Sequence, residues 1–155
     1  IRVPMIATWP GRITPGSASD LPGAFYDVLP TLCDVAGRSV PAPTDGLSFL
    51  PTLTGQGEQP EHEFLYWEFP AYGGQQAVRM GKWKGIRRNM QEGNLEIELY
   101  NLEADIREEQ NVAADHPEVV ARIRGIMERE HSPPAIERFR IAALEEPAKS
   151  QDGKR

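Results

Sequence analysis

The chain of 155 residues contains few of the residue types on which catalysis and metal binding depend. It has one cysteine, Cys33, and three histidines, His62, His116 and His131. A single cysteine excludes an internal disulfide framework and a thiolate metal cluster. The histidines lie far apart in the sequence, with no His or Cys partner at ligand spacing. We therefore expect them at the surface or at helix caps rather than on a metal.

Long apolar runs and an excess of positive charge are also missing. No apolar run approaches the ~20 residues that span a bilayer, and hydrophobic residues make up 39% of the chain. The formal net charge is −6 and the pI is about 5.1, whereas nucleic-acid-binding proteins usually carry a basic face. The sequence predicts a soluble globular chain with neither a membrane span nor a nucleic acid partner.

Motifs for nucleophilic catalysis and phosphate binding are missing as well. No serine stands in a Gly-x-Ser-x-Gly elbow, and Gly73-Gly74 lacks the Gly-Lys-Ser/Thr helix start of a phosphate loop. Cys33 has Leu29 and Leu32 near it on an expected helix and no basic residue before it. This setting favours a core or half-buried position over a nucleophile.

The first part of the sequence consists of short elements separated by turns, since glycine and proline number 14 each. Residues 2–9 are apolar and predict one buried strand, which starts near a sheet edge at Pro4. Residues 10–17 and 41–57 are rich in turn residues and predict loops. Because the chain opens at Ile1 with neither an initiator methionine nor a signal sequence, we expect a piece of something longer rather than a complete mature protein.

A helix is predicted between these loops, from Asp27 to about Ala36. Asp27 is its expected N-cap, Pro30 falls in the first turn and Gly37 follows its end. Its apolar stripe consists of Val28, Leu29, Leu32 and Val35. Such a stripe indicates that one face of the helix is buried.

The second part of the sequence predicts an antiparallel sheet and one covering helix. Strand patterns occur at 64–69, 76–80, 83–86 and 96–102, with a turn at Gly81-Lys82. Helical periodicity follows to residue 131, with Asp115 and Glu118 at capping-box spacing, Pro117 in the first turn and an apolar face that should cover the sheet. Residues 132–155 are charged and predict a docking arm or a frayed tail.

Basic and aromatic residues on these strands are candidates for ligand binding. The basic ones are Arg79, Lys82, Lys84, Arg87 and Arg88. They would suit an anionic ligand, or they form a solvated face balanced by Glu92, Glu96 and Glu98. The aromatic ones are Tyr66, Trp67, Tyr72 and Trp83. They could stack on a sugar ring, although aromatic strands usually build cores; we expect Trp83 in the core, and Tyr72 remains open to either interpretation.

Five blocks of the sequence resemble, in order and spacing, the C-terminal part of the formylglycine-dependent sulfatases. The blocks are Arg2 to Gly11, Asp27 to Gly37, Asp45 to Pro51, Ala77 to Lys84, and Leu99-Tyr100-Asn101-Leu102 with Asn111 downstream. The resemblance implies an α/β chain that is the C-terminal piece of an alkaline-phosphatase-like fold, with a small subdomain of four antiparallel strands and a helix. Residues 1–57 would be the last strand and helix of the large domain, 58–131 the subdomain and 132–155 the tail or docking arm.

The resemblance also implies hydrolysis of sulfate esters by the complete protein and no activity of this chain alone. In the family a Cys or Ser within Cys/Ser-x-Pro-x-Arg becomes formylglycine. Cys33 is followed by Asp34 and cannot be that residue, and the Ser-x-Pro matches at Ser39 and Ser132 lack the arginine. The nucleophile, the calcium ligands and the sulfate-binding lysine would lie upstream of Ile1, so no catalytic or metal-binding residue is assigned.

In this family the C-terminal subdomain often faces the mouth of the site, which makes Glu68, Tyr72, Arg79 and Lys82 candidates for contact with a sulfated small molecule or sugar. The expected partner is the missing N-terminal catalytic domain, and the family is usually exported to the periplasm or secreted. Two alternatives remain open. One is a phosphodiesterase or phosphonate monoester hydrolase of the same superfamily, and the other is a non-catalytic module that binds an anionic sugar.

Overall fold

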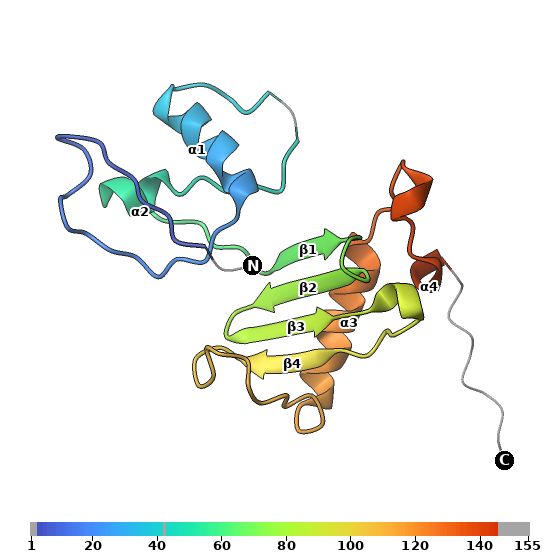
Figure 1. Ribbon diagram of the computed structural model, residues 1–155. Helices are drawn as coiled ribbons and strands as arrows, with labels where there is room; N and C mark the ends of the chain where they lie inside the picture. The colour runs from blue at the N-terminus through green and yellow to red at the C-terminus, as the bar shows by residue number, and fades with distance from the viewer. Residues whose placement is uncertain (1–2, 42, 146–155) are drawn as a thin grey trace, which may run out of the picture. The chain divides into compact units, whose positions relative to one another are not determined.

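The computed structural model describes residues 3–41 and 43–145 (Figure 1). The chain divides into two compact units between Glu63 and Phe64, and we call them the N-terminal unit and the sheet unit. Within the described residues, no helix is long and apolar enough to cross a membrane.

The N-terminal unit contains two short helices and long connecting segments. A 3-10 turn at Phe25–Asp27 leads directly into α1 (Val28–Val35), and Pro30 lies in its first turn as predicted. A second helix, α2 (Leu50–Thr54), lies inside the region 41–57 that was expected to be a loop, and it ends at Gly55 with a left-handed φ of 68°. A short α-helix can form here because Pro51 occupies its first turn and a glycine accepts the left-handed terminus.

The prediction of a buried strand at residues 2–9 is wrong for its described part, residues 3–9, which form neither strand nor helix. Ile6 is 96% exposed and Val3 is 65% exposed. A strand needs a neighbouring strand to take up its backbone hydrogen bonds. The described residues provide none for this segment.

The apolar stripe of α1 is also exposed, contrary to the expectation that it is buried. Leu32 is 59% exposed and Leu29 is 46% exposed, whereas Pro30 and Thr31 are the buried residues of this helix. Cys33 is half-buried, as predicted. The helix therefore turns its most apolar face away from the rest of its own unit.

The sheet unit contains the predicted four-stranded antiparallel sheet, in the order β1-β2-β3-β4 (Figure 1). Its strands are β1 (Leu65–Phe69), β2 (Gln75–Met80), β3 (Trp83–Arg87) and β4 (Glu98–Asn101). A 3-10 turn at Met90–Glu92 lies between β3 and β4. Consecutive strands pair throughout, so each connection is local.

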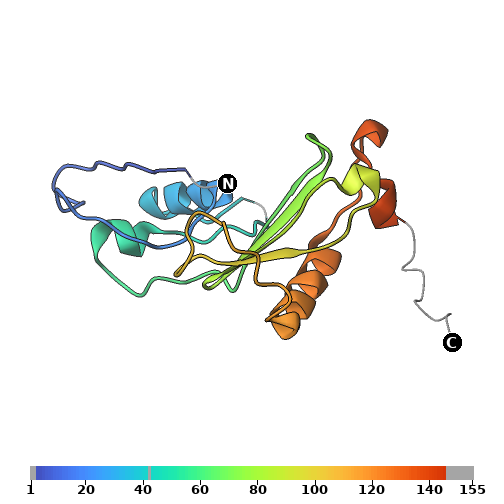
Figure 2. The ribbon, with the colours of Figure 1, turned by 60° about the horizontal axis from the view of Figure 1, so that its bottom comes forward.

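Helix α3 (Pro117–Glu130) covers one face of the sheet (Figure 2). Its fully buried Ile123 and Met127 pack against Val78 and Leu99 of the sheet. Trp83 packs against the edge of this core, as predicted. The helix begins with Pro117 at its first position, but the expected capping box does not form, because His116 is the N-cap and makes no side-chain cap hydrogen bond.

The opposite face of the sheet has its own, smaller apolar cluster. Ala77, Ile86 and Tyr100 are buried there, with Trp67 partly buried beside them. Because side chains alternate along a strand, this cluster and the α3-covered core are built from alternate residues of the same strands. The sheet consequently has two distinct faces, one covered by α3 and one that we call the second face.

The segment after α3 is partly ordered rather than a uniform tail. It holds a 3-10 turn at Glu137–Phe139 and a short helix, α4 (Ala142–Glu145). Ile141 is only 2% exposed, and α4 packs against the 3-10 turn at Met90–Glu92. The part of the predicted tail at 146–155 lies outside the described residues.

Candidate functional site

Glu68 lies at the centre of a polar network on the α3-covered face of the sheet. Its Oε2 atom accepts hydrogen bonds from the Tyr66 hydroxyl at 2.5 Å, from Gln76 Nε2 at 3.0 Å and from His131 Nδ1 at 2.8 Å. Gln76 is 1% exposed and its Oε1 accepts a hydrogen bond from Arg87 Nη1 at 3.1 Å. The network thus connects β1, β2 and β3 to the C-terminal end of α3.

The network fixes the protonation states of its members. Burial opposes ionisation of Glu68, but the hydrogen bonds from Tyr66, Gln76 and His131 outweigh it and lower the pKa of the carboxyl group below its ordinary value of 4.5. Burial and the hydrogen bond to Glu68 raise the pKa of Tyr66 well above 10.0. At neutral pH Glu68 is therefore an anion and Tyr66 a neutral donor, so this arrangement contains no activated nucleophile.

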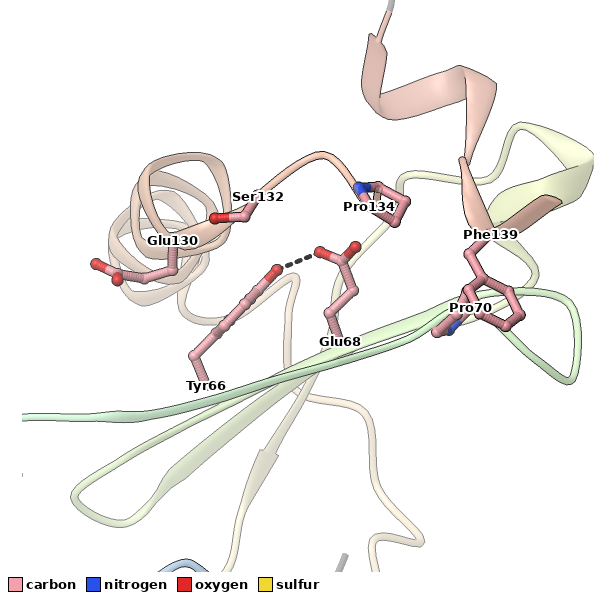
Figure 3. Close-up of a pocket in the computed structure, with 7 residues that line it drawn as sticks. All are labelled: Tyr66, Glu68, Pro70, Glu130, Ser132, Pro134 and Phe139. Atoms are coloured by element: carbon pink, nitrogen blue, oxygen red, sulfur yellow. Dashed lines mark hydrogen bonds between the residues drawn. The ribbon is translucent and has the colours of Figure 1, made fainter. Parts of the chain in front are cut away.

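A hollow of about 270 Å³ lies beside this network. It is lined by Tyr66, Glu68, Pro70, Glu130, Ser132, Pro134 and Phe139. Figure 3 shows the Tyr66 hydroxyl and the Glu68 carboxylate pointing toward each other under Ser132 and Pro134. With two carboxylates and no cationic side chain in its lining, the hollow is poorly suited to a sulfate group.

Burial of Arg87 completes the network. Arg87 is 4% exposed, and its Nε atom is buried with no hydrogen-bond partner in the part of the chain that the structure describes. Burial lowers the pKa of this guanidinium. Arg87, one residue of the predicted basic cluster, therefore lies in the interior of the sheet unit and not on its surface.

The rest of the basic cluster is divided between several partners. Lys84 is buried on the second face of the sheet and pairs with both carboxylate oxygens of Glu108 at 2.5 Å. Arg88 pairs with Glu98 at 3.2 Å. The interpretation of the cluster as one solvated face is therefore wrong for Arg87 and Lys84, because each of them lies inside the fold.

Arg79 and Lys82 lie near the β2–β3 turn. The Nε atom of Arg79 donates to the Gly81 carbonyl at 2.8 Å, and the ammonium of Lys82 lies 5.2 Å from the centre of the Trp83 ring. Lys82 is exposed and Arg79 is half-buried. These two cations remain available to a ligand at this end of the sheet.

The four candidate residues do not form one site. In the antiparallel register Leu65 pairs with Arg79 and Glu68 pairs with Gln76, so Glu68 and Arg79 are three positions apart, or about 10 Å at ~3.3 Å per residue. They also project from opposite faces, because side chains alternate along each strand. Glu68 and Tyr72 belong to the β1–β2 end of the sheet, and Arg79 and Lys82 belong to the β2–β3 end.

The β1–β2 turn carries two exposed aromatic rings. Tyr72 is 83% exposed and Phe69 is 52% exposed, and their ring centres are 5.9 Å apart with planes tilted by 31°. Tyr72 has a left-handed φ of 52°, which is uncommon for a bulky residue. Of the two interpretations of Tyr72, the structure excludes a core position.

Asp27 organises the N-terminal unit in the same way that Glu68 organises the sheet unit. Asp27 is 2% exposed, and its carboxylate accepts hydrogen bonds from Ala24 N at 2.7 Å, Leu47 N at 2.9 Å and His62 Nε2 at 2.8 Å. The Thr31 hydroxyl donates to the Asp27 carbonyl at 2.7 Å and accepts from Phe49 N at 3.0 Å. We call Asp27, Thr31 and His62 the Asp27 clip.

Asp27 is the N-cap residue of α1, as predicted, but its carboxylate makes no cap hydrogen bond to that helix. It bonds to the segment before α1 and to residues 20 and 35 positions away instead. Burial, together with the charges of Asp27 and Asp45, raises the pKa of the neighbouring Tyr26 to about 12. His116 and His131 lie at helix caps, as predicted, because they are the N-cap and C-cap residues of α3. The prediction did not include the carboxylate partners of His62 and His131, which only the long-range fold brings near them.

A metal site does not fit the described residues. Within 3–41 and 43–145, no group of three or more His, Cys, Asp or Glu side chains is arranged to hold a metal ion. The carboxylates nearest to histidines, Asp27 and Glu68, are each occupied by a histidine and by further donors.

Comparison with known proteins gives a family match over most of the chain. The family model described as N-sulphoglucosamine sulphohydrolase, C-terminal, matches residues 1–132. Arylsulfatase A of Bos taurus is 42% identical over 87 residues, which are 54% of this chain and 17% of that protein. Delta 4,5-hexuronate-2-O-sulfatase of Bacteroides thetaiotaomicron is 34% identical over 110 residues, which are 66% of this chain and 22% of that protein.

Solved structures agree with this match. A 2-O GAG sulfatase superposes with a TM-score of 0.56 at 30% identity and covers 66% of this chain and 23% of its own. A phosphonate monoester hydrolase from Silicibacter pomeroyi superposes with a TM-score of 0.57 at 22% identity, covers 87% of this chain and 29% of its own, and shows a shared fold only. The chain spans between 11% and 24% of the lengths of the curated relatives that it matches.

Proposed function

Because the chain belongs to the C-terminal domain family of the N-sulphoglucosamine sulphohydrolase type of sulfatase, we propose that it is the C-terminal portion of an enzyme that hydrolyses sulfate esters. The observation that carries the proposal is the family match over residues 1–132. This chain contributes the sheet unit and its surface, and the reacting groups belong to residues outside it.

The chemistry of the described residues supports this division of labour. Cys33 and Ser132 lack the arginine that the formylglycine motif requires, and Tyr66 is held as a neutral hydroxyl. The calcium ion that the resemblance implies would need ligands outside the described residues, because no cluster among them fits a metal. The remaining tasks for the chain are to cover the catalytic domain and to contact the part of the substrate that does not react.

The missing catalytic domain is also the proposed partner of the N-terminal unit. Residues 1–57 would complete the large domain, 58–131 would form the subdomain and 132–155 would be a tail or docking arm. Ile6, Leu29 and Leu32 are strongly exposed apolar side chains on that unit. Burial of such side chains is favourable by about 25 cal/mol per Å², so a covering domain would stabilise them in place.

Arg79 and Lys82 are the proposed contacts for an anionic substituent of a sulfated small molecule or sugar, because both are accessible cations at one end of the sheet. Glu68 and Tyr72 are proposed to meet the substrate at the other end. Glu68 accepts three hydrogen bonds from its own fold, so it acts chiefly by holding that end in position. We propose periplasmic or secreted localisation, following the family.

An assay of the complete protein tests this function. The gene product that includes residues upstream of Ile1 should hydrolyse a chromogenic aryl sulfate, and the 155-residue chain alone should not. Arg79→Ala and Lys82→Ala should raise KM for a sulfated sugar about two- to fivefold with little change in kcat, as expected for partly screened rim charges.

Matched substrates separate the outcomes. A complete protein that prefers an aryl phosphonate or a phosphodiester to the aryl sulfate would contradict sulfatase activity and support the alternative enzyme class. Turnover by the 155-residue chain alone, abolished by Cys33→Ala, would contradict the placement of the reacting groups outside it. If Arg79→Ala and Lys82→Ala lower kcat equally for the sulfated sugar and the aryl sulfate, the two cations do not contact the substrate at the rim of the site. They would then stabilise the fold instead.

A further inference from the structure

The β1–β2 turn, which contains the proposed substrate contact Tyr72, carries a wider exposed surface. It presents Phe69 and Tyr72, two exposed aromatic rings that lie side by side. Exposed aromatic pairs are unfavourable in water and are characteristic of binding surfaces. We call Phe69, Tyr72 and the amide side chains that flank them the hairpin platform.

The backbone beneath the hairpin platform is hydrogen-bonded to a neighbouring turn. Tyr72, Gly73 and Gly74 have three consecutive left-handed φ angles of 52°, 82° and 77°. Gly73 O accepts from Gln91 N at 2.8 Å, and Gly74 O accepts from Met90 N at 3.2 Å. These bonds fasten the backbone of the β1–β2 turn to the 3-10 turn at Met90–Glu92.

Neither glycine of the turn can be replaced freely. A Cβ on Gly73 would lie 3.1 Å from Asn89 Oδ1, and a Cβ on Gly74 would lie 3.0 Å from Ile141 Cδ1. The side-chain Nε2 of Gln91 also donates to the Pro70 carbonyl at 2.9 Å. The turn that carries both exposed rings therefore combines close packing around its glycines with an uncommon backbone conformation at Tyr72.

The chemistry of the platform is neutral. Residues 69–76 and 89–91 contain no charged side chain, in a chain of which 26% is charged. The amide side chains of Gln75, Asn89 and Gln91 lie on these two segments. Flat aromatic rings beside amide donors and acceptors, without charge, match a pyranose ring, which has an apolar C–H face and hydroxyl edges.

We propose that the hairpin platform is a saccharide subsite that stacks an uncharged face of a sugar ring on Tyr72 and Phe69 while the neighbouring amides bind its hydroxyls. It takes a non-reacting sugar unit of the substrate, which is the part of the proposal that rests on the proposed function. Rigid aromatic side chains suit this task because they provide contact area with little loss of conformational entropy. Because the subsite is uncharged, its affinity should not depend on salt concentration.

A titration of the 155-residue chain with cellobiose and with an N-acetylglucosamine disaccharide, followed by amide NMR, tests the subsite. With at least one of these neutral probes, the amides of 69–75 and 89–91 should shift in a saturable way, equally at low and high salt. Tyr72→Gly removes the ring and keeps the left-handed backbone, and it should weaken binding by about tenfold, the loss of one aromatic stacking contact. Phe69→Ala should weaken binding as well, whereas Tyr72→Phe should retain it.

Ile106→Ala is the matched control, because Ile106 is an apolar residue that is 52% exposed, like Phe69. It lies shortly after β4, near the end of the sheet opposite to the platform, where Leu102 N donates to the Lys82 carbonyl. This variant should bind as the parent chain does. The subsite is refuted if neither disaccharide shifts the platform amides, if binding survives Tyr72→Gly, or if Ile106→Ala abolishes it. These results are independent of aryl sulfate hydrolysis, which involves no sugar and tests the proposed sulfatase activity alone.

Discussion

The N-terminal unit and the sheet unit hold themselves together by different means. The sheet unit buries Leu99, Ile123 and Met127 completely between a sheet and α3. The N-terminal unit instead centres on the buried carboxylate of Asp27 and leaves Ile6 and Leu32 exposed. The sheet unit therefore closes its own core, whereas the N-terminal unit leaves apolar side chains exposed, as the proposed catalytic domain partner would require.

The largest expected effect comes from breaking the Asp27 clip. Asp27→Ala leaves the amides of Ala24 and Leu47 and the ring of His62 without their acceptor. A buried hydrogen-bonding group that is left without its partner typically costs about 1–3 kcal/mol. The amide NMR signals of the N-terminal unit should collapse while those of the sheet unit persist. Asp34→Ala, on the exposed side of α1, is the control, and an unchanged spectrum for Asp27→Ala would contradict the role of the clip.

A core truncation should unfold the other unit. Leu99 is 0% exposed in the core under α3, and a fully buried Leu→Ala change costs about 2–5 kcal/mol. Urea denaturation followed by tryptophan fluorescence of Trp67 and Trp83 should show a lower midpoint. A midpoint within error of the parent would mean that α3 and the sheet do not form a closed core.

Acid should weaken the sheet unit through Glu68. The pKa of Glu68 in the folded unit lies below its ordinary value of 4.5. Ionised Glu68 therefore contributes its full stabilisation above pH 4.5. This contribution is lost as the pH falls through the lowered pKa of the folded state. The difference in unfolding free energy between parent and Glu68→Gln should be constant near neutral pH and shrink below pH 4.5. Glu92→Gln, on the surface of the same unit, should show no such change, and a difference that grows in acid would contradict the network.

The smallest effect is expected on the exposed stripe of α1. Leu32→Ala makes the same chemical change as Leu99→Ala, but Leu32 is 59% exposed. Surface substitutions of this kind usually stay within about 0.5 kcal/mol. In the 155-residue chain the stability should therefore barely change. A loss comparable to that of Leu99→Ala would show that the stripe is already buried in the isolated chain.

The sheet unit was predictable from the sequence because its contacts are local. Each strand pairs with the next one along the chain. Apolar residues recur at every second position in the strands and at helical spacing in 117–130, because one face of each element packs in the core. The resemblance of five blocks to sulfatases also identified the family correctly. The N-terminal unit was less predictable. Residues 3–9 and the stripe of α1 are as apolar as buried elements usually are, but the other described residues do not cover them.

The polar networks could not be predicted for a related reason. His62 and Asp27 are 35 positions apart, and His131 and Glu68 are 63 positions apart. No local spacing rule connects such pairs. The division of the basic cluster was equally hidden, since the partner of Lys84 is Glu108 rather than one of the nearer glutamates.

Hydrogen exchange of the unmodified 155-residue chain tests the contrast between the two units most directly. Amides of β2, β3 and α3 should exchange slowly, by opening of the whole sheet unit, and amides of α1 should exchange much faster, since local stability follows the apolar packing around each element. Slow exchange limited to the sheet unit is the predicted result. Equal protection of α1 and of the sheet would contradict the claim that the N-terminal unit depends on residues outside this chain.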